Sequence, residues 1–115
     1  MGNLKTIISQ TKSEMRRGLV VLTTLALLKE PHYGYSLIQT LENKGIPIEG
    51  NTLYPLLRRL AKQGLLMSEW ETDGSKPRKY YRITDNGETV LKALKDTYKT
   101  STQSLNYILG VMENE

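Results

Sequence analysis

The sequence contains no cysteine, which excludes disulfide bonds and thiolate metal sites and fits a reducing cytoplasm. Its one histidine, His32, leaves no cluster of imidazoles for metal binding or acid–base catalysis. The longest apolar run, Leu19 to Leu28, is about half of the ~20 residues that a membrane-spanning helix needs. No segment that resembles a signal peptide opens the chain. We therefore expect a cytoplasmic protein that uses no cofactor, metal or membrane.

A chain of 115 residues is long enough for one small domain with an appendage. Its formal net charge is +4. Between Thr52 and Arg82 seven basic residues face three acidic ones, so this segment alone has a net charge of +4 and the rest sums to zero. Positive charge gathered in one segment is typical of a surface that binds nucleic-acid phosphates.

Residues 50–64 combine two kinds of side chain at helical spacing. Apolar residues recur with the i, i+3, i+4, i+7 pattern of a buried stripe at Leu53, Leu56, Leu57 and Leu60. The opposite face carries hydrogen-bonding and cationic groups at Tyr54, Arg58, Arg59 and Lys62. This arrangement fits a DNA recognition helix; the alternative is an ordinary amphipathic helix with a solvated charged face.

The ends of this helix are also marked in the sequence. Pro55 lacks an N–H and is tolerated in the first turn, so we expect the helix to begin at Asn51 or Thr52, both good N-cap residues. Gly64 suits a left-handed cap at the C-terminal end.

A β-hairpin is predicted directly after this helix. Residues 65–72 and 79–83 are rich in aromatic and β-branched side chains and flank a basic turn over 73–78. A helix followed by such a hairpin is typical of the winged helix-turn-helix, in which the helix enters the major groove and the wing follows the DNA backbone.

The segments before the recognition helix predict two more helices and a short strand. The first helical region covers residues 4–28 and ends before Pro31, and a shorter helix is expected over 36–44. Residues 46–48 alternate as a strand does and are expected to lie beside the wing. The predicted fold class is therefore mainly α with a small β-wing.

A long helix is predicted after the wing, with Thr84 or Asp85 as its N-cap and Glu88 in a capping box. Its seam positions alternate by three and four residues, as in a coiled coil: Leu91, Leu94, Tyr98, Ser101, Leu105, Ile108 and Met112. A helix of ~28 residues spans about 40 Å, too long for so small a domain to cover. The sequence therefore predicts a homodimer, with residues 1–84 as the DNA-binding domain and 85–115 as the dimerisation helix.

The predicted dimer interface joins this seam to an amphipathic stripe at the start of the chain. Its residues are Leu4, Ile7, Ile8, Leu91, Leu94, Tyr98, Leu105, Ile108 and Met112. Small hydroxyl-bearing residues between positions 97 and 104 stand where leucines would close the seam. Two interpretations remain open: the partner's amino-terminal stripe packs there, or the dimer leaves a gap beside Tyr98.

Short motifs recur in order between about Gly18 and about Leu94. They are Leu27-Leu28 before Pro31, Tyr33-Gly34-Tyr35, the run from Asn51 to Leu60 that begins Asn-Thr-Leu-Tyr-Pro, Gly64-Leu65, and Arg78-Lys79-Tyr80-Tyr81-Arg82-Ile83-Thr84 with Gly87. Together they resemble the PadR family of bacterial transcriptional regulators, in its short subgroup with a single C-terminal helix. Asn51 stands where that family often has glycine or serine, and Asp85 where it often has proline.

The resemblance implies a homodimeric winged helix-turn-helix repressor that binds an inverted repeat in double-stranded DNA. The DNA-binding residues that it implies or leaves as candidates are Tyr33, Asn51, Thr52, Tyr54, Arg58, Lys76 and Arg78. Tyr33, Thr52 and Tyr54 lie at helix N-termini, where free N–H groups meet phosphates. Arg58 has two possible targets, a guanine edge or a phosphate.

The remaining aromatic residues are expected to have mainly structural roles. Tyr35 is expected in the core, and Trp70 is expected to be a cross-strand partner in the wing. Tyr80 and Tyr81 alternate, so one of them should pack inward. Tyr98 aligns with a tryptophan with which members of the short subgroup bind planar drugs between subunits, so the resemblance allows a small, planar, apolar or cationic effector.

The sequence is less consistent with two other classes of function. A winged helix that docks proteins without specific DNA binding is the main alternative, and the basic charge of the recognition face argues against it. An enzyme is less consistent with the sequence, because no nucleophile lies in a motif and Asp73 and His32 fall in separate turns. We therefore expect a DNA-binding regulator without enzymatic activity.

Overall fold

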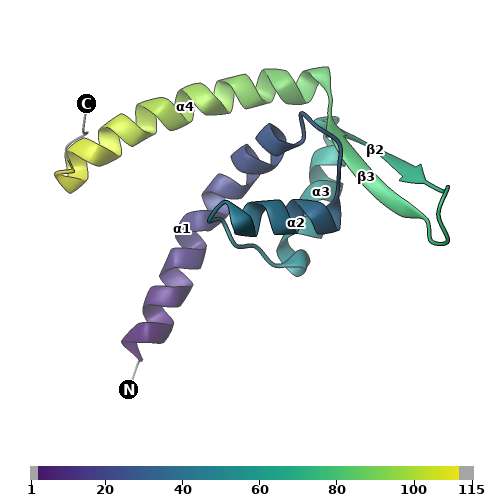
Figure 1. The fold of residues 1–115 in the computed structure, drawn as a ribbon. Helices are drawn as coiled ribbons and strands as arrows, with labels where there is room; N and C mark the ends of the chain where they lie inside the picture. Colours follow the sequence, from purple (N-terminus) through teal and green to yellow (C-terminus); the bar gives the residue numbers. More distant parts are fainter. Residues whose placement is uncertain (1–2, 112–115) are drawn as a thin grey trace.

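The computed structural model describes residues 3–111, which form four helices and a small antiparallel sheet whose hairpin projects from the helices (Figure 1). In chain order the elements are α1 (Leu4–Leu27), β1 (His32–Tyr33), α2 (Gly34–Asn43), α3 (Gly50–Lys62), β2 (Leu66–Glu71), β3 (Arg78–Ile83) and α4 (Asp85–Leu109). A helix pair followed by a two-stranded wing and a long final helix confirms the predicted fold class.

The C-terminal ends of α2 and α3 use the same cap, which explains two glycines of the sequence. After α3, Gly64 has φ +81°, its N–H donates to the Ala61 carbonyl at 3.0 Å, and the Leu65 N–H donates to the Leu60 carbonyl at 2.9 Å. Gly45 plays the same part after α2, with φ +88°. Positive φ is free of steric cost only in glycine, so the predicted cap at Gly64 is confirmed.

The N-terminal ends of α2 and α3 differ from the prediction. The Glu49 carbonyl accepts the N–H groups of Thr52 and Leu53, both at 3.0 Å, so the first turn of α3 closes at Gly50 rather than at Asn51 or Thr52. Helix α2 likewise begins at Gly34, two residues before the predicted start. Glu49 is the N-cap residue of α3 and makes no side-chain cap hydrogen bond, so the side-chain cap predicted at Asn51 or Thr52 does not form.

The third strand of the sheet is not the one that the sequence predicted. The strand order is β1-β3-β2, and His32–Tyr33 pairs with Tyr81 and Tyr80 of β3. The predicted strand at residues 46–48 is wrong, because the Ile46 N–H already donates to the Leu41 carbonyl at 2.8 Å and Pro47 has no N–H to offer a neighbour. This segment is instead the link between α2 and α3.

The core lies where the helices meet the sheet and consists of leucines with one tyrosine: Leu25, Leu28, Leu37, Leu41, Leu53, Leu57, Leu60, Leu66, Tyr81 and Leu91. Tyr81 is buried and Tyr80 is only partly buried, so the prediction that one of the two packs inward is confirmed. The core therefore takes one residue or more from every helix and from both strands of the wing.

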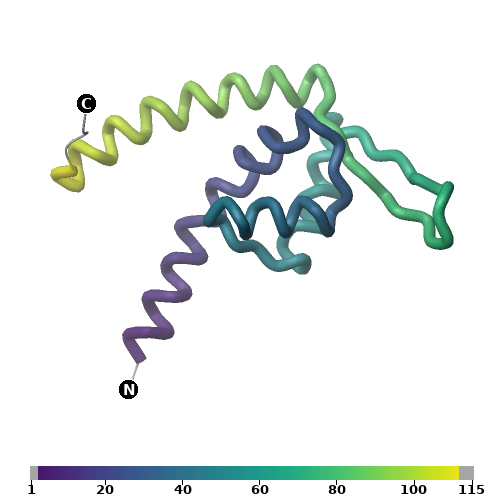
Figure 2. Tube along the Cα trace, in the orientation of Figure 1, coloured from purple at the N-terminus to yellow at the C-terminus, as the bar shows by residue number. Residues whose placement is uncertain are grey.

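The N-cap of α4 is Thr84, whose hydroxyl accepts the Gly87 N–H at 3.0 Å and donates to the Gly64 carbonyl at 2.6 Å. With Thr84 as N-cap, the third helical residue is Gly87, so the capping box predicted for Glu88 does not form. Beyond the core, α1 and α4 diverge toward the two chain ends (Figure 2). None of the helices among residues 3–111 is long and apolar enough to cross a membrane.

Candidate nucleic-acid interface

The first turn of α3 presents its predicted contact residues in two different ways. The side chains of Asn51 and Thr52 are exposed to solvent. The Tyr54 ring is wedged between helices: a Cβ at Gly34 of α2 would collide with it, and a Cβ at Gly50 would lie 3.1 Å from its Cε2 atom. Tyr54 is 38% exposed, so it fixes the two helix starts against each other while one edge reaches the surface.

The rest of α3 has the two faces that its sequence predicts. Leu53, Leu57 and Leu60 are buried, whereas Arg58, Arg59 and Lys62 are exposed. Burial raises the pKa of the Tyr81 hydroxyl, and the positive charge of Arg58 partly opposes this shift. The positive charge of Arg58 is therefore close enough to the Tyr81 hydroxyl to act on its ionisation.

At the turn end of the wing, where Glu71 pairs with Arg78, two predicted DNA contacts touch each other. The Arg78 guanidinium lies 4.4 Å from the centre of the Tyr33 ring and forms an ion pair with Glu71 at 3.1 Å. A hydrogen bond with Tyr33 lowers the pKa of Glu71 below its ordinary value, and Arg78 lowers it further. This cluster joins the end of β1 to the wing, a role that sequence reasoning missed because its members lie far apart along the chain.

The wing also has positive charge that is exposed to solvent. Lys76 is exposed in the turn between β2 and β3, which projects from the body of the molecule (Figure 1). Trp70 pairs across the hairpin with Lys79, whose Nζ atom lies 5.7 Å from the indole ring. The prediction that Trp70 is a cross-strand partner is confirmed.

The position of Tyr35 also differs from the prediction. It was expected in the core, but its side chain is 67% exposed. Because α2 begins at Gly34, the buried positions are Gly34, Leu37 and Leu41, and Tyr35 turns away from them. The Gln39 amide donates to the Tyr35 hydroxyl at 3.1 Å. Tyr35 thus adds an exposed hydroxyl in the first turn of α2.

A groove lies between α1 and α4, at the place where the seam of α4 has small polar residues. Its volume is about 430 Å³, and apolar side chains of α1 such as Leu19 and Leu22 face Tyr98 and Leu105 of α4 across it. Tyr98 is 50% exposed. In this chain the gap beside Tyr98 is therefore bordered by its own first helix.

The predicted seam residues divide into two groups. Leu91 is 2% exposed within the single chain and belongs to the core, so its assignment to a dimer interface is corrected. Leu94 also packs against the core. In contrast, Leu4, Ile7, Ile8, Leu105 and Ile108 are all exposed. Met112 lies outside the described residues.

Metal-binding side chains do not gather in the described part of the chain. No group of three or more His, Asp or Glu residues there could hold a metal ion. The geometry offers instead a basic helix face, a basic wing and exposed hydroxyl groups at two helix starts. These are groups that bind phosphates and base edges.

Comparison with known proteins gives a consistent result. The family model described as "Transcriptional regulator PadR-like family" matches residues 21–93. A PadR family transcriptional regulator from Eggerthella lenta superposes with a TM-score of 0.87 at 49% identity, over 92% of this chain and 95% of that chain. A PadR-like transcriptional regulator from Bacillus cereus superposes with a TM-score of 0.76 at 28% identity, over 89% and 99% of the two chains.

One similar sequence belongs to the transcriptional regulator Rv3488 of Mycobacterium tuberculosis. The two are 39% identical over 59 residues, which are 51% of this chain. The matched part spans 55% of the relative's length, so that comparison extends over little more than half of the relative.

Proposed function

This chain belongs to the PadR-like family of transcriptional regulators, and we propose that it is a cytoplasmic repressor that binds an inverted-repeat operator as a homodimer. The observation that carries the proposal is the face formed by α3 and the wing, which gathers the net charge of +4 between Thr52 and Arg82. Clustered cations release counterions from DNA and thereby favour its binding. Family and structural relatives are transcriptional regulators rather than enzymes.

The start of α3 enters the major groove in this proposal. Asn51 and Thr52 are free for DNA because the backbone, and not their side chains, caps the helix. The hydroxyl of Tyr54 reaches out from a ring that is held in place by Gly34. Arg58 lies further along α3, so it reaches either a guanine edge or the phosphate beside it.

The wing and the start of α2 bind the DNA backbone. Lys76 is the main wing contact, because its ammonium group is exposed in the turn. Arg78 and Tyr33 hold each other and Glu71, so a phosphate must compete with Glu71 for the guanidinium. We therefore rank Lys76 above Arg78 as a source of affinity.

The dimer forms through the outer halves of α1 and α4. Leu4 is 71% exposed and Ile108 74% exposed in the single chain, and apolar stripes of this length on protruding helices are typical of subunit interfaces. We propose that residues 85–115 act as the dimerisation helix and residues 1–84 as the DNA-binding part. Two-fold symmetry then sets two copies of α3 on two half-sites.

An effector is a further part of the proposal. The groove beside Tyr98, of about 430 Å³, has the size and the apolar lining of a small-molecule site. A planar, apolar or cationic molecule would stack on the tyrosine ring. If it turned one subunit against the other, the two recognition helices would leave their spacing of ~34 Å and DNA would be released.

Selection of binding sites from random DNA tests the proposal. The expected result is enrichment of an inverted repeat whose half-site centres lie about one helical turn, or a multiple of it, apart. The variant Lys92→Ala with Lys95→Ala, on the exposed side of α4, serves as a control for charge lost outside the proposed interface and should select the same sequence. Failure of the parent protein to enrich any sequence would favour the protein-docking alternative.

A further inference from the structure

A second basic surface lies on α1, outside the segment 52–82. Residues 4–20 contain four cations and one acidic residue, a net charge of +3. Acidic residues elsewhere offset this charge, so the sum over the whole chain conceals it. Lys5, Lys12 and Arg16 recur at helical spacing on one side of α1, and the single acid, Glu14, lies on the opposite side.

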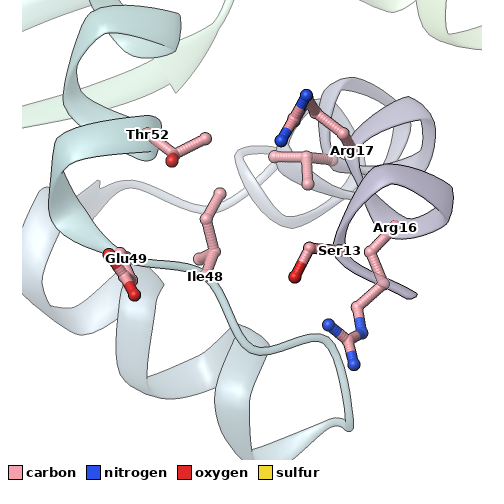
Figure 3. Close-up of a pocket in the computed structure, with 7 residues that line it drawn as sticks. Ser13, Arg16, Arg17, Ile48, Glu49 and Thr52 are labelled. Atoms are coloured by element: carbon pink, nitrogen blue, oxygen red, sulfur yellow. The ribbon is translucent and has the colours of Figure 1, made fainter. Parts of the chain in front are cut away.

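Part of this surface is hollowed. Ser13, Arg16 and Arg17 of α1 line one side of a cavity of about 240 Å³, and Ile48, Glu49 and Thr52 line the other (Figure 3). The two guanidinium groups lie at opposite ends of the α1 side, with the Ser13 hydroxyl between them. The cavity thus joins the middle of α1 to the first turn of the recognition helix.

The positive groups of this cavity have no acidic partner. Of the residues that the structure describes, only Arg78 and Glu71 form an ion pair, so neither Arg16 nor Arg17 is neutralised. Glu49 lies across the cavity from both guanidinium groups (Figure 3). Two unpaired cations against one acid leave a positive, concave surface, which attracts anions.

The position of the cavity on α1 keeps it open in a dimer. Ser13 and Arg17 lie on the side of the helix opposite to Leu4 and Ile8, the stripe that we propose a second copy covers. The groove toward α4 lies on the stripe side as well, at Gly18 and neighbouring residues. Dimerisation through α1 and α4 therefore leaves Ser13 and Arg17 uncovered, and Arg16, which is partly buried, lies beside them on the cavity wall.

We propose that Arg16 and Arg17 bind a phosphate of the DNA backbone, on the side of α3 opposite to the wing. This inference rests on the proposed DNA-binding function and extends its contact surface to α1. Guanidinium groups donate paired N–H groups to phosphate oxygens, and the hydroxyl groups of Ser13 and Thr52 are further donors on the cavity wall.

The arrangement of the elements favours backbone phosphate over a free anion as the occupant. Helix α3 lies between α1 and the hairpin (Figure 1). When α3 occupies the major groove, the wing meets the backbone on one side of the groove, and the Arg16–Arg17 cavity meets the backbone on the other. The two contacts would hold the recognition helix at a defined depth and angle.

The test compares the parent with the double variant Arg16→Ala, Arg17→Ala on a selected operator, with Lys92→Ala, Lys95→Ala as the control for lost charge. For each half-site, the slope of log affinity against log salt should fall by about 0.9 in the arginine variant only. The ratio of the parent's operator affinity to that of the arginine variant should then fall about threefold per half-site between about 50 and about 200 mM salt. The charge-preserving variant Arg16→Lys, Arg17→Lys should keep the parent's slope.

Phosphate ethylation interference identifies the contact itself. Ethylation of one phosphate per half-site, on the side away from the wing, should block binding of the parent and leave binding of the arginine variant unaffected.

Glu49→Gln, which removes the opposing charge, should increase affinity for operator and random DNA alike. Equal salt slopes and equal interference patterns in parent and variant would overturn the inference. Inorganic pyrophosphate should compete with DNA for the cavity, so pyrophosphate binding that leaves the parent's DNA affinity unchanged would overturn it as well. A parent that selects no DNA overturns the proposed function as well.

Discussion

The winged-helix body and the two helical arms of this protein differ in how their apolar residues are covered. In the body, leucines of α2, α3 and the wing are buried against each other within one chain. In the arms, which are the outer halves of α1 and α4, residues of the same kind such as Leu4 and Ile108 face solvent. Burial of each such side chain contributes about 1.5–3 kcal/mol. In the proposed dimer the body folds on its own, and a second copy covers the apolar residues of the arms.

The largest expected effect comes from a cavity in the body. Leu57→Ala removes a fully buried side chain of α3 and should cost about 2–5 kcal/mol of unfolding free energy, at every protein concentration. Ile108→Ala, in an arm, should cost less, and its cost should depend on protein concentration because it acts through association. Urea denaturation at two concentrations measures both. A concentration-dependent cost for Leu57→Ala would refute the distinction.

The contact between Gly34 and Tyr54 gives the next effect. Gly34→Ala places a methyl group in the space of the Tyr54 ring, and the overpacking should cost about 1–3 kcal/mol. Tyr54→Ala makes room for that methyl group, so the double variant should lose less stability than the two single changes added together. Strict additivity would show that the ring does not hold the two helix starts together.

Only part of this fold could be predicted from the sequence alone. The stripes of α3, the cap at Gly64 and the wing were predictable, because each depends on residues close together in sequence. The strand at β1 was not, since two residues form it only by pairing with β3, far along the chain. The helix starts were misplaced because no side chain marks them with a cap hydrogen bond. Tyr33, Glu71 and Arg78 come together only because β1, β2 and β3 pair in that same sheet. The DNA-contacting roles of the site residues stay predictions.

A smaller effect is expected at the tip of the wing. Lys76→Ala should weaken binding to operator and random DNA about equally and lower the salt slope by about one. The exposed side chain has no part in the core, so the free energy of unfolding should not change. Fluorescence anisotropy at several salt concentrations measures the slope. A loss confined to operator DNA would place Lys76 on a base edge instead.

The smallest effect concerns pH and the ion pair at the turn end of the wing. Because its hydrogen bond with Tyr33 and the charge of Arg78 lower the pKa of Glu71 in the folded chain, ionised Glu71 stabilises this contact above its ordinary pKa of 4.5. The contribution is lost as pH falls through the lowered folded pKa. Trp70 fluorescence should therefore change in acid below the range of an ordinary glutamate. Glu71→Gln should remove that step, and an unchanged step would assign it to another group.

Sedimentation equilibrium of the full chain and of a chain that ends at Thr97 tests whether the arms hold two independently folded bodies together as a dimer. The full chain should have the mass of a dimer. The shortened chain keeps every residue of the core, so it should be a folded monomer whose operator affinity is lower by about 10²–10⁴, since the two half-sites are no longer linked. A shortened chain that still sediments as a dimer, or a full chain that is a monomer, would contradict this account.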